Sequence, residues 1–361
     1  MRSVPFLFSF LLLALLAGAL AACGQARRRA KPRMTLHPHQ TERFRLSASP
    51  GVPDGYPATI DEARFITPAG GSFPVPWGHF LDSGWGGGGT AWVVGDALQP
   101  VPDSLEIRWF SYTEDTFYEG HFLLPQERIY ALLKRGLWDD ENRKQVTYND
   151  LSVCVAPAGA VYVWLTMGRS NAVLIGRYQA REIAYDYARH RPGVDRVADV
   201  RSTRAKLAPE VQREIAAGTI SAKRWDAYIK PYPWQLAFSQ PLTLTDLSFS
   251  YFDAEATGDP VSPDMAAFFQ IWLAPSPKPV PKSCMVYVAG AYGRKKLFKV
   301  SPFDERETMA AFQALAAKHP KEPITLFVDT DEQLSKATLS LRAGTQVISL
   351  TKSSVQFFDL K

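Results

Sequence analysis

The chain has 361 residues, of which 46% are hydrophobic and 21% charged, a composition that excludes an intrinsically disordered protein. Its formal net charge of +5 would favour a nucleic-acid partner if the charge were spread over the body of the protein. Five positive charges instead lie together near the N-terminus, in Arg27, Arg28, Arg29, Lys31 and Arg33. The remaining sequence is close to neutral, so we expect no nucleic-acid partner.

Residues 1–22 have the pattern of a bacterial lipoprotein signal peptide. Arg2 supplies a positive start, residues 4–20 are almost wholly apolar, and small residues precede Cys23 in Leu20-Ala21-Ala22-Cys23. We therefore predict cleavage between Ala22 and Cys23, with lipid attached to the Cys23 thiol and to its freed amine; two or more acyl chains anchor a protein stably. The alternatives are a transmembrane helix, for which the apolar run is short, and a soluble secreted protein.

The residue after the cysteine is Gly24, and not the aspartate that retains enteric lipoproteins in the inner membrane. This predicts an outer-membrane protein, lipid-anchored and facing the periplasm. The basic run then lies beside the anchor, where it either rests on anionic headgroups or is a solvated spacer. We assign residues 23–60 to a flexible basic tether, because this segment contains several prolines and no apolar period.

Residues 61–274 are predicted to form a mainly β, α+β body, an antiparallel β-sandwich-like structure with inserted helices. Short runs with period two, separated by turn residues, favour this architecture. The strands are expected at 105–109, 152–165 (with a turn at Pro157-Gly159), 173–178, 234–238, 247–252 and 268–273. The helices are expected at 125–135, 208–217 and 221–229, the first two of which begin with proline.

Four prolines in residues 274–281 favour a stiff connector, so we assign 275–283 to a Pro-rich linker. Residues 284–361 are then predicted to form a small α/β domain. Its helix is expected at 304–319, with acidic residues in the first turn and Met309, Phe312 and Leu315 on one stripe. Its strands are expected at 285–289, 324–328, 337–341 and 345–350.

Two cysteines, Cys154 and Cys284, remain free to pair once Cys23 carries lipid. In an oxidising periplasm a disulfide between them would close a long loop and stabilise the fold. The alternative is two buried free thiols, and the sequence leaves both possibilities open.

The sequence lacks a recognisable catalytic or metal-binding constellation. The six histidines are scattered and lack metal-ligand spacing. Gly86-Gly87-Gly88-Gly89 lacks the lysine and hydroxyl residue of a phosphate loop, so it favours a mobile loop near a binding surface. We therefore expect no cofactor, no metal and no enzymatic activity.

Several segments resemble a known family. They are Leu105–Glu114 with Phe117-Tyr118-Glu119 and Leu124-Pro125, then Ala156–Leu165, and finally Trp225-Asp226-Ala227-Tyr228 and Tyr232-Pro233-Trp234. Over roughly residues 75–275 they are similar to the proteobacterial lipoprotein family catalogued as domain of unknown function 2931. The resemblance is carried by Trp109, Ser111, Glu114, Phe117, Tyr118, Pro125, Pro157, Gly159, Trp164, Trp225, Tyr228 and Trp234. The large aromatic residues among them are expected to pack in the core rather than to cage a ligand.

Members of that family are often encoded beside antibacterial lipase effectors of type VI secretion. The resemblance thus implies an immunity protein whose rigid surface occludes a secreted effector. One alternative is an envelope-maintenance or carbohydrate/lipid-binding lipoprotein without a toxin partner. Another is a hydrolase with dispersed catalytic groups, which a hollow with Ser or Asp within hydrogen-bond reach of His79, His121 or His190 would favour.

Overall fold

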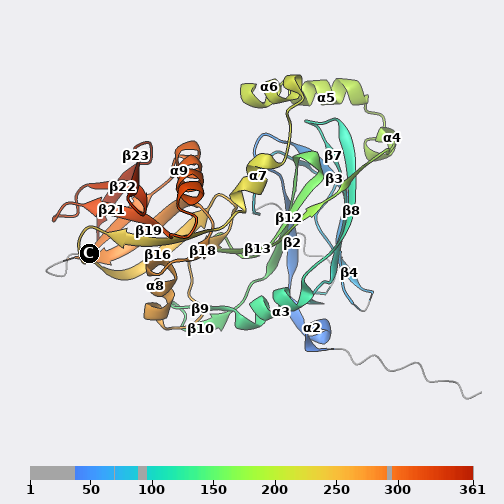
Figure 1. Cartoon of the computed structure of the whole chain (residues 1–361). Coiled ribbons are helices and arrows are strands. Elements are labelled where there is room, and N and C mark those ends of the chain that lie inside the picture. Colours follow the sequence, from blue (N-terminus) through green and yellow to red (C-terminus); the bar gives the residue numbers. More distant parts are fainter. Residues whose placement is uncertain (1–36, 69, 88–95, 291–294, 361) are drawn as a thin grey trace, which may run out of the picture. The chain divides into compact units, whose positions relative to one another are not determined.

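The computed structural model describes residues 37–68, 70–87, 96–290 and 295–360. The predicted lipid attachment at Cys23 and the cleavage after Ala22 lie outside these residues and stay predictions. Within the described part, strands dominate and form a nine-stranded, a six-stranded and a five-stranded sheet (Figure 1). The predicted β-rich α+β fold is confirmed. None of the described helices combines the length and apolar character needed to cross a bilayer.

The nine-stranded sheet joins early and late parts of the chain. Adjacent strands within this sheet are antiparallel, except for β2 and β11, which are parallel. In spatial order the strands are β2 (Ser47–Gly51), β11 (Asp150–Ala156), β12 (Ala160–Met167), β13 (Asn171–Gln179), β17 (Ala256–Thr257), β16 (Thr243–Tyr251), β19 (Pro281–Ala289), β20 (Lys295–Val300) and β24 (Val355–Asp359).

The six-stranded sheet packs one face against the nine-stranded sheet. Its strands are β14 (Arg181–Ile183), β8 (Thr116–Leu123), β7 (Ser104–Ser111), β3 (Ala58–Ile66) and β4 (Ser72–Pro74), with β5 (Phe80–Leu81) also paired to β3. Leu105, Ile107 and Trp109 of β7 share one cluster with Val153 and Val163 of the opposite sheet. This first core gives residues 44–180 the layered arrangement of a sandwich.

A second core lies on the other face of the nine-stranded sheet. Along β11, Val153 and Val155 belong to the first core, whereas Cys154 and Ala156 belong to the second. Burial on both faces explains why this strand is an unbroken apolar run rather than an alternating one.

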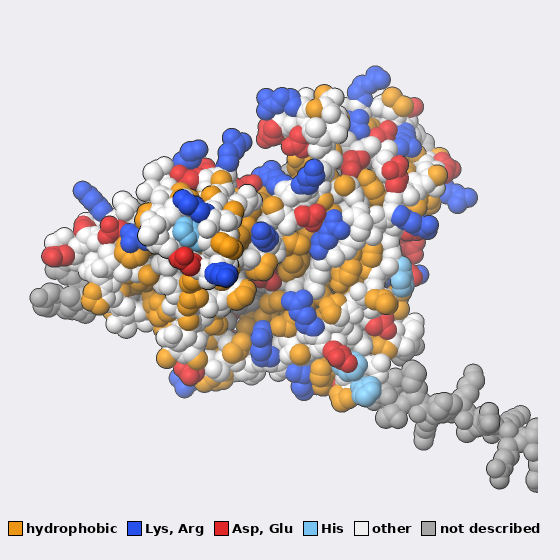
Figure 2. Space-filling model, in the orientation of Figure 1, with side chains coloured by type: hydrophobic (Ala, Val, Ile, Leu, Met, Phe, Trp, Pro, Cys, Tyr) orange, Lys and Arg blue, Asp and Glu red, His pale blue; other side chains and the backbone are white. Residues whose placement is uncertain are grey.

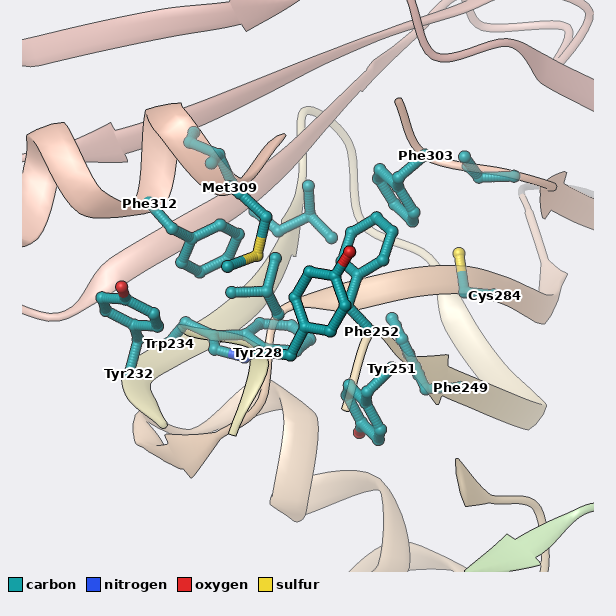
Figure 3. Packing of buried hydrophobic residues seen from close by; sticks show 14 of the residues in the cluster. Tyr228, Tyr232, Trp234, Phe249, Tyr251, Phe252, Cys284, Phe303, Met309 and Phe312 are labelled. Atoms are coloured by element: carbon teal, nitrogen blue, oxygen red, sulfur yellow. The ribbon is translucent and has the colours of Figure 1, made fainter. Parts of the chain in front are cut away.

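The five-stranded sheet and buried residues of four helices complete the second core. Its strands are β18 (Ser276–Lys278), β15 (Tyr232–Phe238), β21 (Ile324–Thr330), β22 (Ala337–Ala343) and β23 (Gln346–Leu350), with β15 and β21 parallel. Helix α9 (Glu305–Lys318) begins at Asp304, whose side chain accepts from the Glu307 N–H. Its Met309 and Phe312 point towards Trp234 of β15 (Figure 3).

The other helices are short, and so are two further two-stranded sheets. The helices are α2 (Pro38–Thr41), α3 (Gln126–Arg135), α4 (Tyr187–His190), α5 (Arg196–Arg204), α6 (Pro209–Ala217), α7 (Lys223–Tyr228) and α8 (Met265–Leu273). The small sheets pair β1 (Arg43–Arg45) with β6 (Leu98–Pro100), and β9 (Leu137–Asp139) with β10 (Lys144–Val146). The predictions of α3, α6, α7 and α9 are confirmed. Helices α4 and α5 were not predicted; α5 buries only Val200, too few apolar residues to form a stripe.

The strand predicted at 268–273 is wrong, because this segment lies in α8. Phe268 and Trp272, one turn apart, are its two buried residues. Asp264 caps the helix by accepting from the Ala267 N–H (3.0 Å). The aromatic-rich composition and the following Pro275 favoured a strand, whereas the spacing of the buried residues and the cap favour the helix.

The tether and linker boundaries also need correction. Residues 43–60 are not a tether, since they contain β1, β2 and the start of β3, and Val52 is fully buried. Residues 275–283 are not a linker, since they form β18 and the beginning of β19. Residues 38–361 form one compact unit, so the predicted division into a body at 61–274 and a domain at 284–361 is wrong.

One long edge of β13 is closed by side chains rather than by a strand. Its only residue paired with β17 is Ala172. Two residues further along, the Leu174 N–H donates to Glu255 Oε1 (2.6 Å), and Arg128 donates to the Leu174 carbonyl (2.8 Å) and the Ile175 carbonyl (2.9 Å). These contacts satisfy backbone groups that a neighbouring strand would otherwise bind.

Candidate interaction surface

Glu114 lies where two of the segments that carry the family resemblance meet. It belongs to the turn between β7 and β8 and accepts hydrogen bonds from Ser111 Oγ (2.9 Å) and Tyr118 OH (3.0 Å). It also accepts from the backbone N–H of Ala158 (2.8 Å), in the turn between β11 and β12. That turn has positive φ at Ala158 (57°) and Gly159 (70°), and a Cβ at Gly159 would lie 2.9 Å from Tyr118. One carboxylate therefore ties the six-stranded sheet to the nine-stranded sheet.

The aromatic residues of the resemblance are interior residues. Trp109 stacks on Tyr118 with ring centroids 5.3 Å apart. Phe117 packs under α4 and α5, and Pro125 immediately precedes α3. The buried members of the whole set are Trp109, Ser111, Phe117, Tyr118, Pro157, Gly159, Trp164, Trp225, Tyr228 and Trp234. Their main role is packing in the core; Trp225 and Tyr228 also line a small hollow.

Cys154 and Cys284 are both buried and free. They lie on β11 and β19 of the same sheet, with four strands between them. At about 4.8 Å per strand this separation is far beyond the reach of a disulfide. Of the two alternatives, the structure therefore shows the free thiols.

Part of the tetraglycine segment lies outside the described residues. Of its four glycines, Gly86 packs on Ala254 and Gly87 packs on Ser152.

The face of the six-stranded sheet opposite the first core, which we call the outer face, carries a ladder of alternating charges. A β-bulge in β3 breaks the register between Ile60 and Glu62, so the adjacent carboxylates of Asp61 and Glu62 both face outward. Across the strands, Arg64 pairs with Glu106 at 2.6 Å.

Arg108 is the centre of this ladder. Its Nε donates to Asp61 Oδ2 (2.8 Å) and its second nitrogen donates to Glu62 Oε2 (3.2 Å). Glu119 lies 3.6 Å away, and the guanidinium sits 4.5 Å from the centre of the Tyr185 ring. Three carboxylates therefore hold one arginine rigidly, which suits it to a preorganised interface.

His190, at the end of α4, faces the bulge. Its Nδ1 lies 3.2 Å from Asp61 Oδ1, and its side chain is only 2% exposed. Burial lowers the pKa of the imidazole, and this outweighs the opposing effect of the hydrogen bond to Asp61. The other nitrogen, Nε2, is buried without a hydrogen-bond partner among the described residues. The Phe110, Phe117 and Tyr187 rings surround it, with centroids 5.3–5.6 Å from that of His190.

Three adjoining hollows mark the outer face. One of about 410 Å³ lies over the charge ladder, one of about 340 Å³ lies between Arg64 and Trp77, and one of about 490 Å³ lies between Trp77 and His190. Trp77 is 46% exposed and Phe80 51% exposed. Together the surface offers exposed aromatic side chains and arginines, which are enriched at protein interfaces, beside carboxylates, which are depleted at interface centres.

Several residues of this surface could not be found from sequence. The alternation of Glu106 and Arg108 indicates an outward face, but nothing in the sequence marks the bulge that turns Asp61 towards His190 from 129 residues away. No group of three His, Cys, Asp or Glu residues that could hold a metal occurs among the residues that the structure describes. Figure 2 shows basic side chains interspersed with acidic ones on the face it displays, without a large basic patch.

Comparison with known proteins adds one match. A family described as protein of unknown function (DUF2931) matches residues 31–222, a little more than half of the chain. The match therefore starts and ends earlier than the resemblance over 75–275 suggested, and Trp225, Tyr228 and Trp234 fall outside it. The outer face, from β3 to α4, falls inside it. Neither a curated protein nor a solved structure was found to match.

Proposed function

The chain belongs to the DUF2931 family, and from this premise we propose that it is an envelope lipoprotein whose outer face binds and occludes a protein partner. The partner class is a secreted antibacterial effector of the lipase type, against which the protein provides immunity. Acylated Cys23 would hold it at the outer membrane, facing the periplasm.

The observation that carries this proposal is the composition of the outer face. Exposed Trp77 and Phe80 lie beside the rigid Arg108 ladder, and aromatic and arginine side chains are the commonest energetic centres of protein interfaces. Isolated exposed apolar residues need no explanation, but here they line hollows that share residues with the ladder.

The proposed mechanism is steric. A sheet held by a buried core on one face and by fixed ion pairs on the other loses little freedom when a partner docks. A partner whose active-site opening is covered by this sheet cannot reach its lipid substrate, and no chemistry by the lipoprotein is required. The anchor would place the surface where an incoming toxin acts.

A genetic experiment tests the immunity role. The gene and any neighbouring effector gene are deleted, each is restored alone, and the strains are grown in competition. We expect periplasmic effector to kill cells without this protein and to spare cells with it. An effector that is harmless in its absence would contradict the proposal.

A pair of variants tests the surface. Trp77→Ala and Phe80→Ala are expected to weaken partner binding by roughly 30-fold each, as interface hot spots do. Phe358→Ala is the matched control, because Phe358 is exposed to 46% on β24. Isothermal titration with the purified effector measures the effect. Equal affinity of the Phe80 and Phe358 variants would exclude the outer face as the interface.

A hydrolase is the second candidate, favoured by Asp61 within hydrogen-bond reach of His190 beside the hollow of about 490 Å³. A catalytic histidine oriented through Nδ1 would need Nε2 to reach a nucleophile. That atom is buried and unpartnered among the described residues, which favours binding over catalysis. Ester hydrolysis that is present in the wild type and abolished by His190→Asn would reverse this preference.

A further inference from the structure

A smaller hollow, of about 150 Å³, shares no lining residue with those of the outer face. Its walls come from the segment before β3, the Trp85 loop, α7, the end of β16, β19 and the start of α9. It thus lies where the part of the chain that matches the family meets the part beyond it. Small-molecule sites often form at such junctions between structural parts.

The aromatic wall of this hollow is fixed in place. Trp85 donates from its indole N–H to the Phe252 carbonyl (2.9 Å), and its ring contacts the Tyr162 and Trp164 rings edge-on at 4.9 and 5.0 Å. Tyr228 stacks on Phe252 with centroids 5.7 Å apart, and Figure 3 shows the two rings side by side. A rigid aromatic surface loses little conformational entropy when it binds a ring-shaped ligand.

The polar groups of the hollow fall into two sets. Arg224 and Glu305 are already committed to each other, with Nε to Oε1 at 3.0 Å and the second nitrogen to Oε2 at 2.6 Å. Asp54 and Lys282 are exposed, and neither side chain has a hydrogen bond or ion pair among the described residues. The rim therefore holds one acceptor and one donor that a ligand can use.

Size and charge restrict the ligand class. A volume near 150 Å³ equals about five water molecules, too little for a peptide, a nucleotide or a lipid chain. Two acidic and two basic residues line the hollow, so neither an anion nor a cation is favoured over a neutral molecule. An aromatic wall with both donors and acceptors at its rim suits a ring that is apolar on its face and carries hydroxyl groups at its edge.

We propose that this hollow binds one pyranose ring of a saccharide. The C–H face of the sugar packs on Trp85, and its hydroxyl groups bond to Asp54 and Lys282. This site is separate from the proposed protein-binding face, so either can fail without the other.

The test uses the full-length protein, labelled with ¹⁵N-tryptophan, in a detergent that carries no sugar. The Trp85 indole signal, assigned by its loss in Trp85→Phe, is followed while glucose, galactose and N-acetylglucosamine are added. We expect at least one sugar to shift this signal with a saturating curve. Inorganic phosphate and tetramethylammonium are the charged comparisons and should not shift it.

Two variants locate the binding. Asp54→Asn and Lys282→Ala should each weaken sugar binding by roughly tenfold, as expected when a hydrogen bond to a charged group is lost. The controls are Asp329→Asn and Lys318→Ala, both exposed and outside the lining of the hollow. The absence of any sugar-dependent shift, a shift as large with either charged comparison, or equal weakening in the controls would overturn the proposal.

Discussion

A single carboxylate, that of Glu114, accepts three hydrogen bonds and connects two sheets. Two of its partners, Ser111 and Tyr118, lie three and four residues from Glu114 in the sequence. Its contact with Ala158, 44 residues further along the chain, could not be predicted, because it depends on how the sheets stack. The local half of this junction was therefore predictable and the long-range half was not.

Replacing Glu114 by Gln should lower the free energy of unfolding by about 1–3 kcal/mol. The amide keeps the shape of the side chain but turns one acceptor into a donor, which leaves a hydroxyl or N–H group without an acceptor. Urea unfolding measures the change. Glu332→Gln, at an exposed position, is the control and should change stability little; similar losses in both variants would contradict a special role for Glu114.

His190 gives the fold a dependence on pH. Burial holds its pKa below the value of about 6.5 that it has in the unfolded chain. As the pH falls through this interval the unfolded state binds a proton that the native state does not, so the native state loses stability. The stabilisation from the neutral, buried histidine is fully present above its pKa in the unfolded state. It is lost as the pH falls towards its lower pKa in the folded state.

His190→Asn should therefore make the free energy of unfolding depend less on pH between neutrality and mild acid. Asparagine keeps a donor near the position of Nδ1 but does not titrate. Urea unfolding at a series of pH values measures the slope. His121→Asn, whose ring is 55% exposed, is measured beside it for comparison. A slope unchanged by His190→Asn would exclude this histidine as its origin.

At the scale of elements, β18 and α8 show which sequence signals were misjudged. Pro275, Pro277, Pro279 and Pro281 alternate, and β18 is an edge strand of the five-stranded sheet. Prolines at every second position remove the N–H groups from one side of a strand and leave those on the other side. An edge strand tolerates this because it pairs on one side only, whereas a central strand pairs on both. For α8, Asp264 was a sequence signal for the start of a helix, but the aromatic composition of the segment led to the prediction of a strand.

The cap of α8 makes a measurable contribution. Asp264→Ala should lower the free energy of unfolding by about 1 kcal/mol, because the Ala267 N–H loses its acceptor. Asp264→Asn retains an acceptor oxygen and should recover most of the loss. Thermal or urea unfolding of the three proteins gives the comparison, and an alanine variant as stable as the wild type would contradict the cap.

At the scale of the whole molecule, the two cores differ in how far along the chain their residues lie. The first core uses only residues 46–180, all within the family match, whereas the second combines residues from Tyr56 to Leu350. The sequence predicted four strands of the five-stranded sheet (β15, β21, β22 and β23), but in the six-stranded sheet it predicted only β7 and missed β3 and β8. It could not predict that β16 pairs with β19 or that β15 pairs with β21, because pairing partners far apart in sequence carry no local signal.

A chain ending at residue 274 should not fold like the intact protein. It loses β19, α9 and four of the five strands of the five-stranded sheet, and it exposes Leu247 and Phe249 of β16. We expect increased binding of an apolar dye and a lower midpoint in urea. A chain of residues 38–361 is the control, since it retains the compact unit. If the shortened chain unfolds at the same urea concentration as the intact protein, the predicted division into two domains at residues 275–283 would be supported after all.

The closure of β13 by Arg128 and Glu255 has a consequence for neighbouring copies. An uncovered strand is a template on which another molecule can build its own strand. If the proposed acyl anchor concentrates many copies in one leaflet, an uncovered β13 edge would promote edge-to-edge strand pairing between them. Arg128 and Glu255 already bind the backbone groups of Leu174 and Ile175, so strand addition by a neighbouring copy is blocked at this part of β13.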